Sequence, residues 1–109
     1  MSEVHVVQEG TEISAANLTR LGYKEYRDFI DKCDRAFQKF FYGDDGRRKY
    51  SVEFRLWVYP NGRSWDCHFS TKTDTADGYI WVTLSEKTIE LCEKRCEAIW
   101  GVTGAVMYD

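Results

Sequence analysis

The chain has 109 residues, of which 30% are charged and 16% are aromatic, and its formal net charge is −3. This length predicts one domain, residues 1–109, with room for one hydrophobic core. The mild acidity argues against the broad basic surface typical of nucleic-acid-binding domains, and no apolar run approaches the roughly 18 residues of a membrane span.

The first part of the chain is predicted to be mainly helical. Residues 4–7 are a short β-prone run that suits an edge strand. Ser14 is placed to cap a short helix that runs through Leu21 and ends at Gly22. Residues 23–42 then predict the strongest helix, because apolar residues recur there at steps of three and four. They form one stripe: Tyr26, Phe29, Ile30, Cys33, Phe37, Phe40 and Phe41.

Residues 50–70 predict a β-hairpin about the dipeptide Asn61-Gly62. This dipeptide suits a two-residue type I′ turn, in which both central residues have positive φ. The turn would set three apolar pairs across the strands: Val58 with Trp65, Leu56 with Cys67, and Phe54 with Phe69. A slip of one residue would bring polar side chains against this apolar row, so the sequence disfavours it.

A third strand is predicted at residues 79–84. There the apolar residues Ile80, Val82 and Leu84 alternate with Tyr79, Trp81 and Thr83. A second helix follows, capped by Thr83 or Ser85 and ended by Gly101. Its buried stripe consists of Ile89, Cys92, Cys96 and Ile99. Residues 102–108 are a last β-prone segment, which together with residues 4–7 could extend the sheet at its edges.

The expected fold class is α+β, a two-layer sandwich with a three-stranded (or more) antiparallel meander and two helices on one face. The order is (β)-α-β-β-β-α-(β). Two amphipathic helices need an apolar surface to cover, and one face of the sheet supplies it. The side chains of this inner face are Val52, Phe54, Leu56, Val58, Trp65, Cys67, Phe69, Ile80, Val82 and Leu84.

The opposite face of the sheet, here called the outer face, mixes aromatic with charged side chains. Large exposed aromatic patches usually mark interaction sites, and Trp, Tyr and Arg most often dominate binding energy. The leading hypothesis is a non-enzymatic protein-binding module, such as an adaptor, regulator or inhibitor of a larger complex. Its anchors would be Trp57 and Trp81, flanked by Tyr59 and Tyr79, while Arg55, Asp66 and His68 would orient the partner.

Other interpretations of the same face are open. The N-terminal segment could cover it, two copies could bury it in a homodimer, or the third strand could pair in the opposite sense. The same face could also be the active site of a ribonuclease-like enzyme, with Glu53 as base, His68 as acid and Arg55 as phosphate clamp. Trp57 or Tyr59 could then stack an RNA base.

An RNA-binding domain is a further alternative. The predicted order of helix, three strands and helix resembles that of double-stranded RNA-binding domains, although the match is to element order alone. Asp44 and Asp45 would partly balance the basic residues available for such a surface. Those basic residues are Lys24, Arg27, Lys39, Arg47, Arg48 and Lys49.

The four cysteines are expected to be free thiols in a reducing cytoplasm, because the N-terminus does not have the pattern of a signal peptide. Four thiols that converge in the fold could bind zinc, but the usual two-residue spacing between ligand cysteines is absent. Core packing is therefore the favoured interpretation for Cys33, Cys67, Cys92 and Cys96. No metal is therefore expected, and no nucleotide cofactor is expected either, since no glycine-rich phosphate-binding motif occurs.

Overall fold

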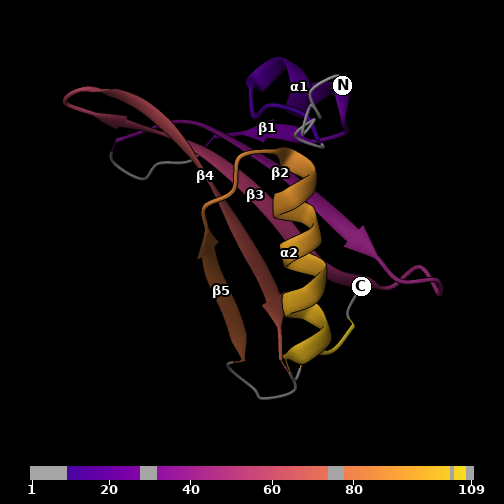
Figure 1. The fold of residues 1–109 in the computed structure, drawn as a ribbon. Coiled ribbons are helices and arrows are strands. Elements are labelled where there is room, and N and C mark those ends of the chain that lie inside the picture. Colours follow the sequence, from indigo (N-terminus) through magenta and orange to yellow (C-terminus); the bar gives the residue numbers. More distant parts are fainter. Residues whose placement is uncertain (1–9, 28–31, 74–77, 104, 108–109) are drawn as a thin grey trace, which may run out of the picture.

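The computed structural model describes residues 10–27, 32–73, 78–103 and 105–107. One antiparallel sheet contains the strands in the order β1-β2-β3-β4-β5, with a helix before and after it along the chain (Figure 1). The predicted α+β class and antiparallel meander are confirmed. The elements are α1 (Ala15–Arg20), β1 (Lys24–Tyr26), β2 (Cys33–Tyr42), β3 (Arg48–Tyr59), β4 (Gly62–Lys72), β5 (Tyr79–Leu84) and α2 (Ile89–Val102).

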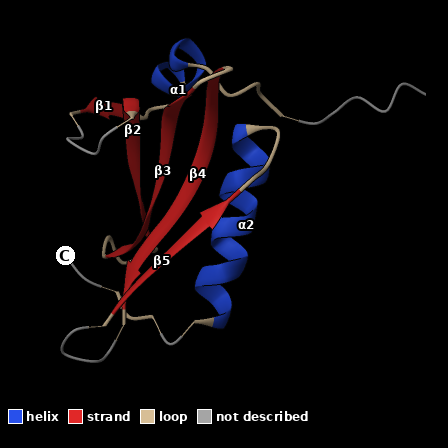
Figure 2. Ribbon diagram, turned by 90° about the vertical axis from the view of Figure 1, so that its left-hand side faces the viewer, coloured by secondary structure: helices blue, strands red, loops and turns tan. Residues whose placement is uncertain are grey.

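Both helices contribute to the core on the inner face of the sheet; α2 was predicted to do so, whereas α1 stands where a helix over residues 23–42 was expected. Leu18 of α1 and Ile89 of α2 are fully buried in one apolar cluster with Phe54 and Phe69 of the sheet. Cys92 and Cys96, from the predicted stripe of the second helix, are buried in the same cluster. Figure 2 shows α2 on one side of the sheet, so the other side is left to the outer face.

The helix ends follow local capping chemistry. The Ser14 side chain accepts a hydrogen bond from the Asn17 amide, which confirms the predicted cap of α1. The cap of α2 is Thr88, whose hydroxyl accepts from the Leu91 amide, so the prediction of Thr83 or Ser85 is wrong. Thr83 still belongs to β5, and α2 continues one residue past Gly101.

The predicted helix over residues 23–42 is wrong, because this segment supplies β1 and β2. Phe37 and Phe41 share the inner face of β2, and a separation of four residues fits one face of a helix and one face of a strand equally. Pairing with β3 decides the outcome: Phe37 lies opposite Phe54 and Phe41 opposite Tyr50. With five strands, the element order no longer resembles that of double-stranded RNA-binding domains.

The hairpin is confirmed, but its register is shifted by two residues. Tyr59 pairs with Gly62, so the two loop residues are Pro60 and Asn61. Proline holds φ near −65°, which excludes it from the first position of a type I′ turn. Gly62 takes the positive φ of 139° directly after the turn. An even shift keeps every side chain on its predicted face.

The end segments are only partly described. Residues 4–7 lie outside the described residues. Residues 1–9 of the N-terminal segment, residues 1–22, that could have covered the outer face also lie outside them, whereas α1 packs into the inner-face core through Leu18. Within residues 102–108, Val102 closes α2 and Ala105 forms an isolated antiparallel bridge with Thr73. β5 runs antiparallel to β4, which confirms the sense predicted for the third strand.

Candidate functional site

The outer face is built on the central strands β3 and β4, with β5 at its edge. In the described part of the chain neither helix covers it (Figure 2). Across this face Glu53 lies opposite His68, Arg55 opposite Asp66, and Ser70 opposite Trp81. The strands therefore bring most of the predicted site residues into adjacent rows.

Glu53 is the centre of a buried polar cluster on this face. Only 5% of the residue is exposed. Its carboxylate accepts hydrogen bonds from the Tyr26 hydroxyl at 2.5 Å, the Gln38 amide at 3.0 Å and the Arg55 guanidinium at 3.1 Å. Burial and the bond to this carboxylate raise the pKa of Tyr26 above its usual range, so the phenol stays a donor. Sequence reasoning missed Tyr26 and Gln38, since it placed both on a helix.

His68 is the centre of a second cluster and is 4% exposed. Its Nε2 lies 2.9 Å from Asp66 Oδ1, and its Nδ1 lies 3.1 Å from the Thr83 hydroxyl. Asp66 Oδ1 also accepts from the indole N–H of Trp57 at 2.6 Å. Both ring nitrogens of His68 are therefore engaged by side chains of the outer face.

Aromatic side chains lie over these clusters. The Trp81 ring lies over His68, with centroids 5.0 Å apart, and the Arg55 guanidinium lies 4.9 Å from the Trp81 centroid. Arg55 is also 5.9 Å from the Trp57 centroid, so it links the two predicted anchors. Trp81 remains 40% exposed and Tyr79 60% exposed. This part of the outer face, here called the aromatic centre, consists of Arg55, Trp57, Tyr79 and Trp81.

Tyr59 does not belong to the aromatic centre. It pairs with Gly62, whereas Trp81 pairs with Ser70, eight positions further along β4. At about 3.3 Å per residue this offset is roughly 26 Å. Tyr59 is exposed at the end of the hairpin, where it would reach only a large partner.

The ribonuclease-like arrangement expected of Glu53, Arg55 and His68 differs from the one observed. Because of the register shift, Glu53 rather than Arg55 lies opposite His68. Both nitrogens of His68 and both oxygens of Glu53 already have partners within the face. These bonds hold the neighbouring side chains of the outer face in place.

Three of the four cysteines converge, but in the core. Cys67, Cys92 and Cys96 are buried on the inner face, and hydrogen bonding of the Cys67 thiol with Cys92 and Cys96, together with burial, raises its pKa. Cys33 does not join them, because β2 carries it opposite Trp57. Within the described ranges no cluster of His, Cys, Asp and Glu has the arrangement of a metal site.

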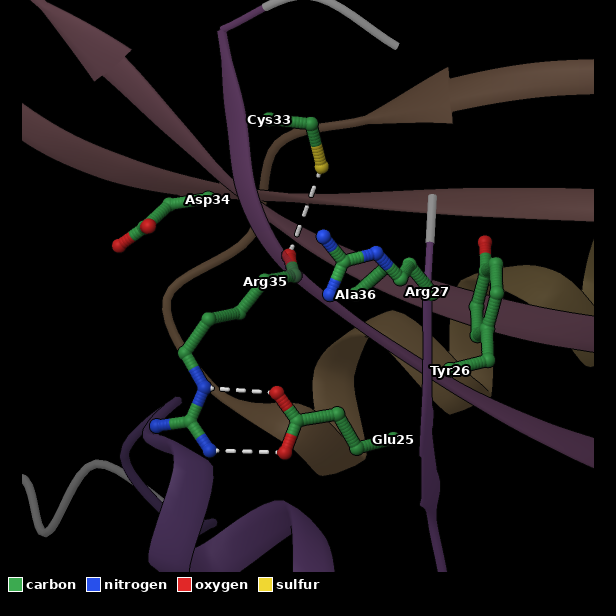
Figure 3. Close-up of a pocket in the computed structure, with 7 residues that line it drawn as sticks. All are labelled: Glu25, Tyr26, Arg27, Cys33, Asp34, Arg35 and Ala36. Atoms are coloured by element: carbon green, nitrogen blue, oxygen red, sulfur yellow. Dashed lines mark hydrogen bonds and ion pairs between the residues drawn. The ribbon is translucent and has the colours of Figure 1, made fainter. Parts of the chain in front are cut away.

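A cavity of about 490 Å³ opens beside β1 and the start of β2. Figure 3 shows Glu25 and Arg35 reaching toward each other across it, joined by two hydrogen bonds of 2.8 Å each. The bond to Arg35 lowers the pKa of Glu25, and the same bond raises that of Arg35. The charges of Glu25 and Arg35 neutralise one another, and Asp34, which also lines the cavity, pairs with Arg63 at 3.0 Å.

The basic residues expected to form an RNA surface make separate contacts. Lys39 donates to the Leu21 carbonyl at 2.8 Å, and Lys49 pairs with Glu97 at 2.8 Å. Arg47 donates to the Met107 carbonyl, and Arg48 lies 3.8 Å from the Phe40 ring centroid. Arg27 lines the cavity beside β1, and Lys24 is exposed on that strand.

No family model, curated protein or solved structure matches this chain. Neither described helix is long and apolar enough to cross a bilayer.

Proposed function

We propose that this chain is a non-enzymatic protein-binding module whose contact surface is the aromatic centre of the outer face. The observation that carries the proposal is Trp81, a large ring that is 40% exposed and lies under the Arg55 guanidinium. Trp and Arg are the residues that most often dominate binding energy. An adaptor, regulator or inhibitor of a larger complex would use such a surface.

The clusters beneath the aromatic centre favour tight binding. Arg55 is held by Glu53, Trp57 by Asp66, and Tyr79 by the Ser70 hydroxyl at 2.5 Å. Side chains that are already fixed lose less conformational freedom when a partner docks. The buried residues Glu53 and His68 would act by positioning the surface residues, while Trp81 and Tyr79 would make the contact.

The test is to isolate a partner and to measure its affinity for matched variants. A partner retained from lysate of the source organism would be purified and titrated by calorimetry against wild type, Trp81→Ala and Tyr42→Ala. Tyr42 is the control, because it is 55% exposed and lies at the end of β2, outside the aromatic centre. We expect Trp81→Ala to weaken binding by about 2 kcal/mol, which is roughly 30-fold, and Tyr42→Ala to leave it unchanged.

The proposal also requires that Trp81→Ala stays folded. The substitution removes one ring contact with His68 and one cation–π contact, each worth about 0.5–1.5 kcal/mol. Circular dichroism and urea unfolding of both variants check this. Equal affinity of wild type and folded Trp81→Ala for every partner recovered would overturn the proposal.

We further propose that the module works in a reducing compartment such as the cytoplasm. All four cysteines are free thiols, and three of them pack against one another in the core. Small secreted domains commonly carry structural disulfides instead. Thiol titration of protein purified from its source without added reductant would count four free thiols; fewer would contradict this location.

A further inference from the structure

The two edges of the sheet differ in how they are protected against strand pairing. β1 is the short edge, with three residues of which Lys24 and Glu25 are charged. Short length and charge are the usual devices that block an edge strand. β5 has six residues, YIWVTL, with no charge, proline or glycine, and it pairs with β4 without a bulge. Of the two terminal strands of the sheet, β5 is therefore the one suited to accept another strand.

The hydrogen bonds of β4 show which backbone groups of β5 point outward. The Thr73 amide donates to the Gly78 carbonyl at 3.1 Å, so the backbone of residue 78 faces β4. In an antiparallel pair this direction alternates along the strand. Residues 80, 82 and 84 therefore bond to β4, and the N–H and C=O groups of Tyr79, Trp81 and Thr83 point away from the sheet.

The side chains of these three residues leave that edge open. Tyr79 is bonded to Ser70, Trp81 lies over His68, and Thr83 contacts the same histidine, so all three lean toward β4. The main contacts of α2 with the sheet are to β3 and β4. β5 is the last strand of the sheet, and among the described residues no element pairs with its free edge (Figures 1 and 2).

We propose that β5 pairs antiparallel with β5 of a second copy of this chain, joining two sheets into one. The outward groups fix the register. A two-fold axis at Trp81 sets Trp81 opposite itself and Tyr79 opposite Thr83, so every outward N–H and C=O within the strand finds a partner. Ile80 would then meet Val82 on the inner face, and no charged residue of either β5 enters the interface.

This inference goes beyond the proposed function, because it uses the backbone edge rather than the aromatic centre. Pairing through the edge leaves the outer faces of both copies accessible. Two copies of the aromatic centre would then lie side by side on one continuous face. A partner with two equivalent contact points would gain affinity from this arrangement without any new contact.

The test compares two substitutions at one position. Trp81→Ala keeps the outward N–H, whereas Trp81→Pro removes it without breaking a bond to β4, and proline is tolerated on edge strands at such positions. In analytical ultracentrifugation we expect wild type and Trp81→Ala to reach twice the 12.8 kDa chain mass with rising concentration, and Trp81→Pro to stay monomeric. A wild-type protein that is monomeric at every concentration would overturn the proposal, and so would a dimeric Trp81→Pro.

A cross-link tests the register and does not depend on the proline variant folding. In a Cys33→Ser background, Trp81→Cys places two thiols on the two-fold axis. The Cα atoms of such a hydrogen-bonded pair lie about 5.5 Å apart, within the range of a disulfide. Mild oxidation should give a covalent dimer, while Tyr42→Cys in the same background should not. Equal cross-linking of the two variants would contradict pairing at Trp81. Loss of partner binding by Trp81→Ala in a protein that still dimerises would separate this inference from the proposed function.

Discussion

The Glu53–Arg55 pair gives a sharp test of the buried layer beneath the aromatic centre. The side chains are only 7% and 11% exposed, and the shortest N–O distance is 3.1 Å. Glu53→Ala would leave a nearly buried guanidinium, the Tyr26 hydroxyl and the Gln38 amide without their common acceptor. Removing one partner of a buried pair costs about 3–5 kcal/mol. We expect about 3 kcal/mol, since Arg55 lies near enough to the surface to regain some water.

Glu25→Ala is the matched control. Glu25 and Arg35 also form a glutamate–arginine pair on neighbouring strands, and its two hydrogen bonds of 2.8 Å are the better geometry. Its side chains, however, are 46% and 42% exposed. Exposed pairs contribute roughly 0–1 kcal/mol, because water solvates the separated charges and salt screens them.

Urea unfolding of wild type, Glu53→Ala and Glu25→Ala at neutral pH measures the two costs. Because Glu53 and Arg55 are buried, we expect Glu53→Ala to lower the free energy of unfolding more than Glu25→Ala does, although the Glu53–Arg55 distance is the longer one. A cost for Glu25→Ala equal to or above that for Glu53→Ala would refute this reasoning. Glu53→Ala should also lower the affinity for a partner, because Arg55 would lose the carboxylate that positions it over Trp81.

Three further predictions concern stability. Gly62→Ala should lower the free energy of unfolding by about 1–3 kcal/mol, measured with urea, because Gly62 has a φ of 139°. Gly101→Ala should instead stabilise the protein by roughly 0.5–1 kcal/mol, because Gly101 lies in the last turn of α2 with open space around it. Bonding to Lys49 lowers the pKa of Glu97 in the folded protein, so its contribution is complete above the unfolded pKa of about 4.3 and is lost as pH falls through the folded value. Urea midpoints from pH 7 to 3 should therefore fall less steeply for Glu97→Gln than for wild type. Burial raises the pKa of Tyr23, so stability should decline as pH rises above the unfolded tyrosine value of about 10, and absorbance at 295 nm should show this phenol ionising only on unfolding.

The parts of the fold that sequence predicted well are those where one periodicity dominates. In β5 the alternation of Ile80 and Val82 with Trp81 has a period of two, and the strand has the predicted bounds. In α2 the spacing of Ile89, Cys92 and Cys96 fits only a helix, and all three are buried. The hairpin faces were also predicted, because an even register shift does not change them.

The failures occurred where local signals were ambiguous. Phe37 and Phe41 fit the same face of a helix and of a strand, and only the partner strand β3 distinguishes them. The hairpin register depended on which two residues formed the turn. In the observed hairpin Pro60 and Asn61 form the loop, and the fixed φ of Pro60 excludes a type I′ turn at this pair of residues.

The error over residues 23–42 also explains the main change in the candidate site. As a helix, this segment could only cover the inner face, and Glu53 would have stayed on an exposed strand with free acid–base chemistry. As β1 and β2, it adds two strands beside β3 and brings Tyr26 and Gln38 to the carboxylate. Glu53 thereby becomes a buried acceptor that holds Arg55 in place. The extra strands thus shift the accessible part of the outer face toward Trp81 and Tyr79, next to the free edge of β5, where a partner and a second copy would meet the chain side by side.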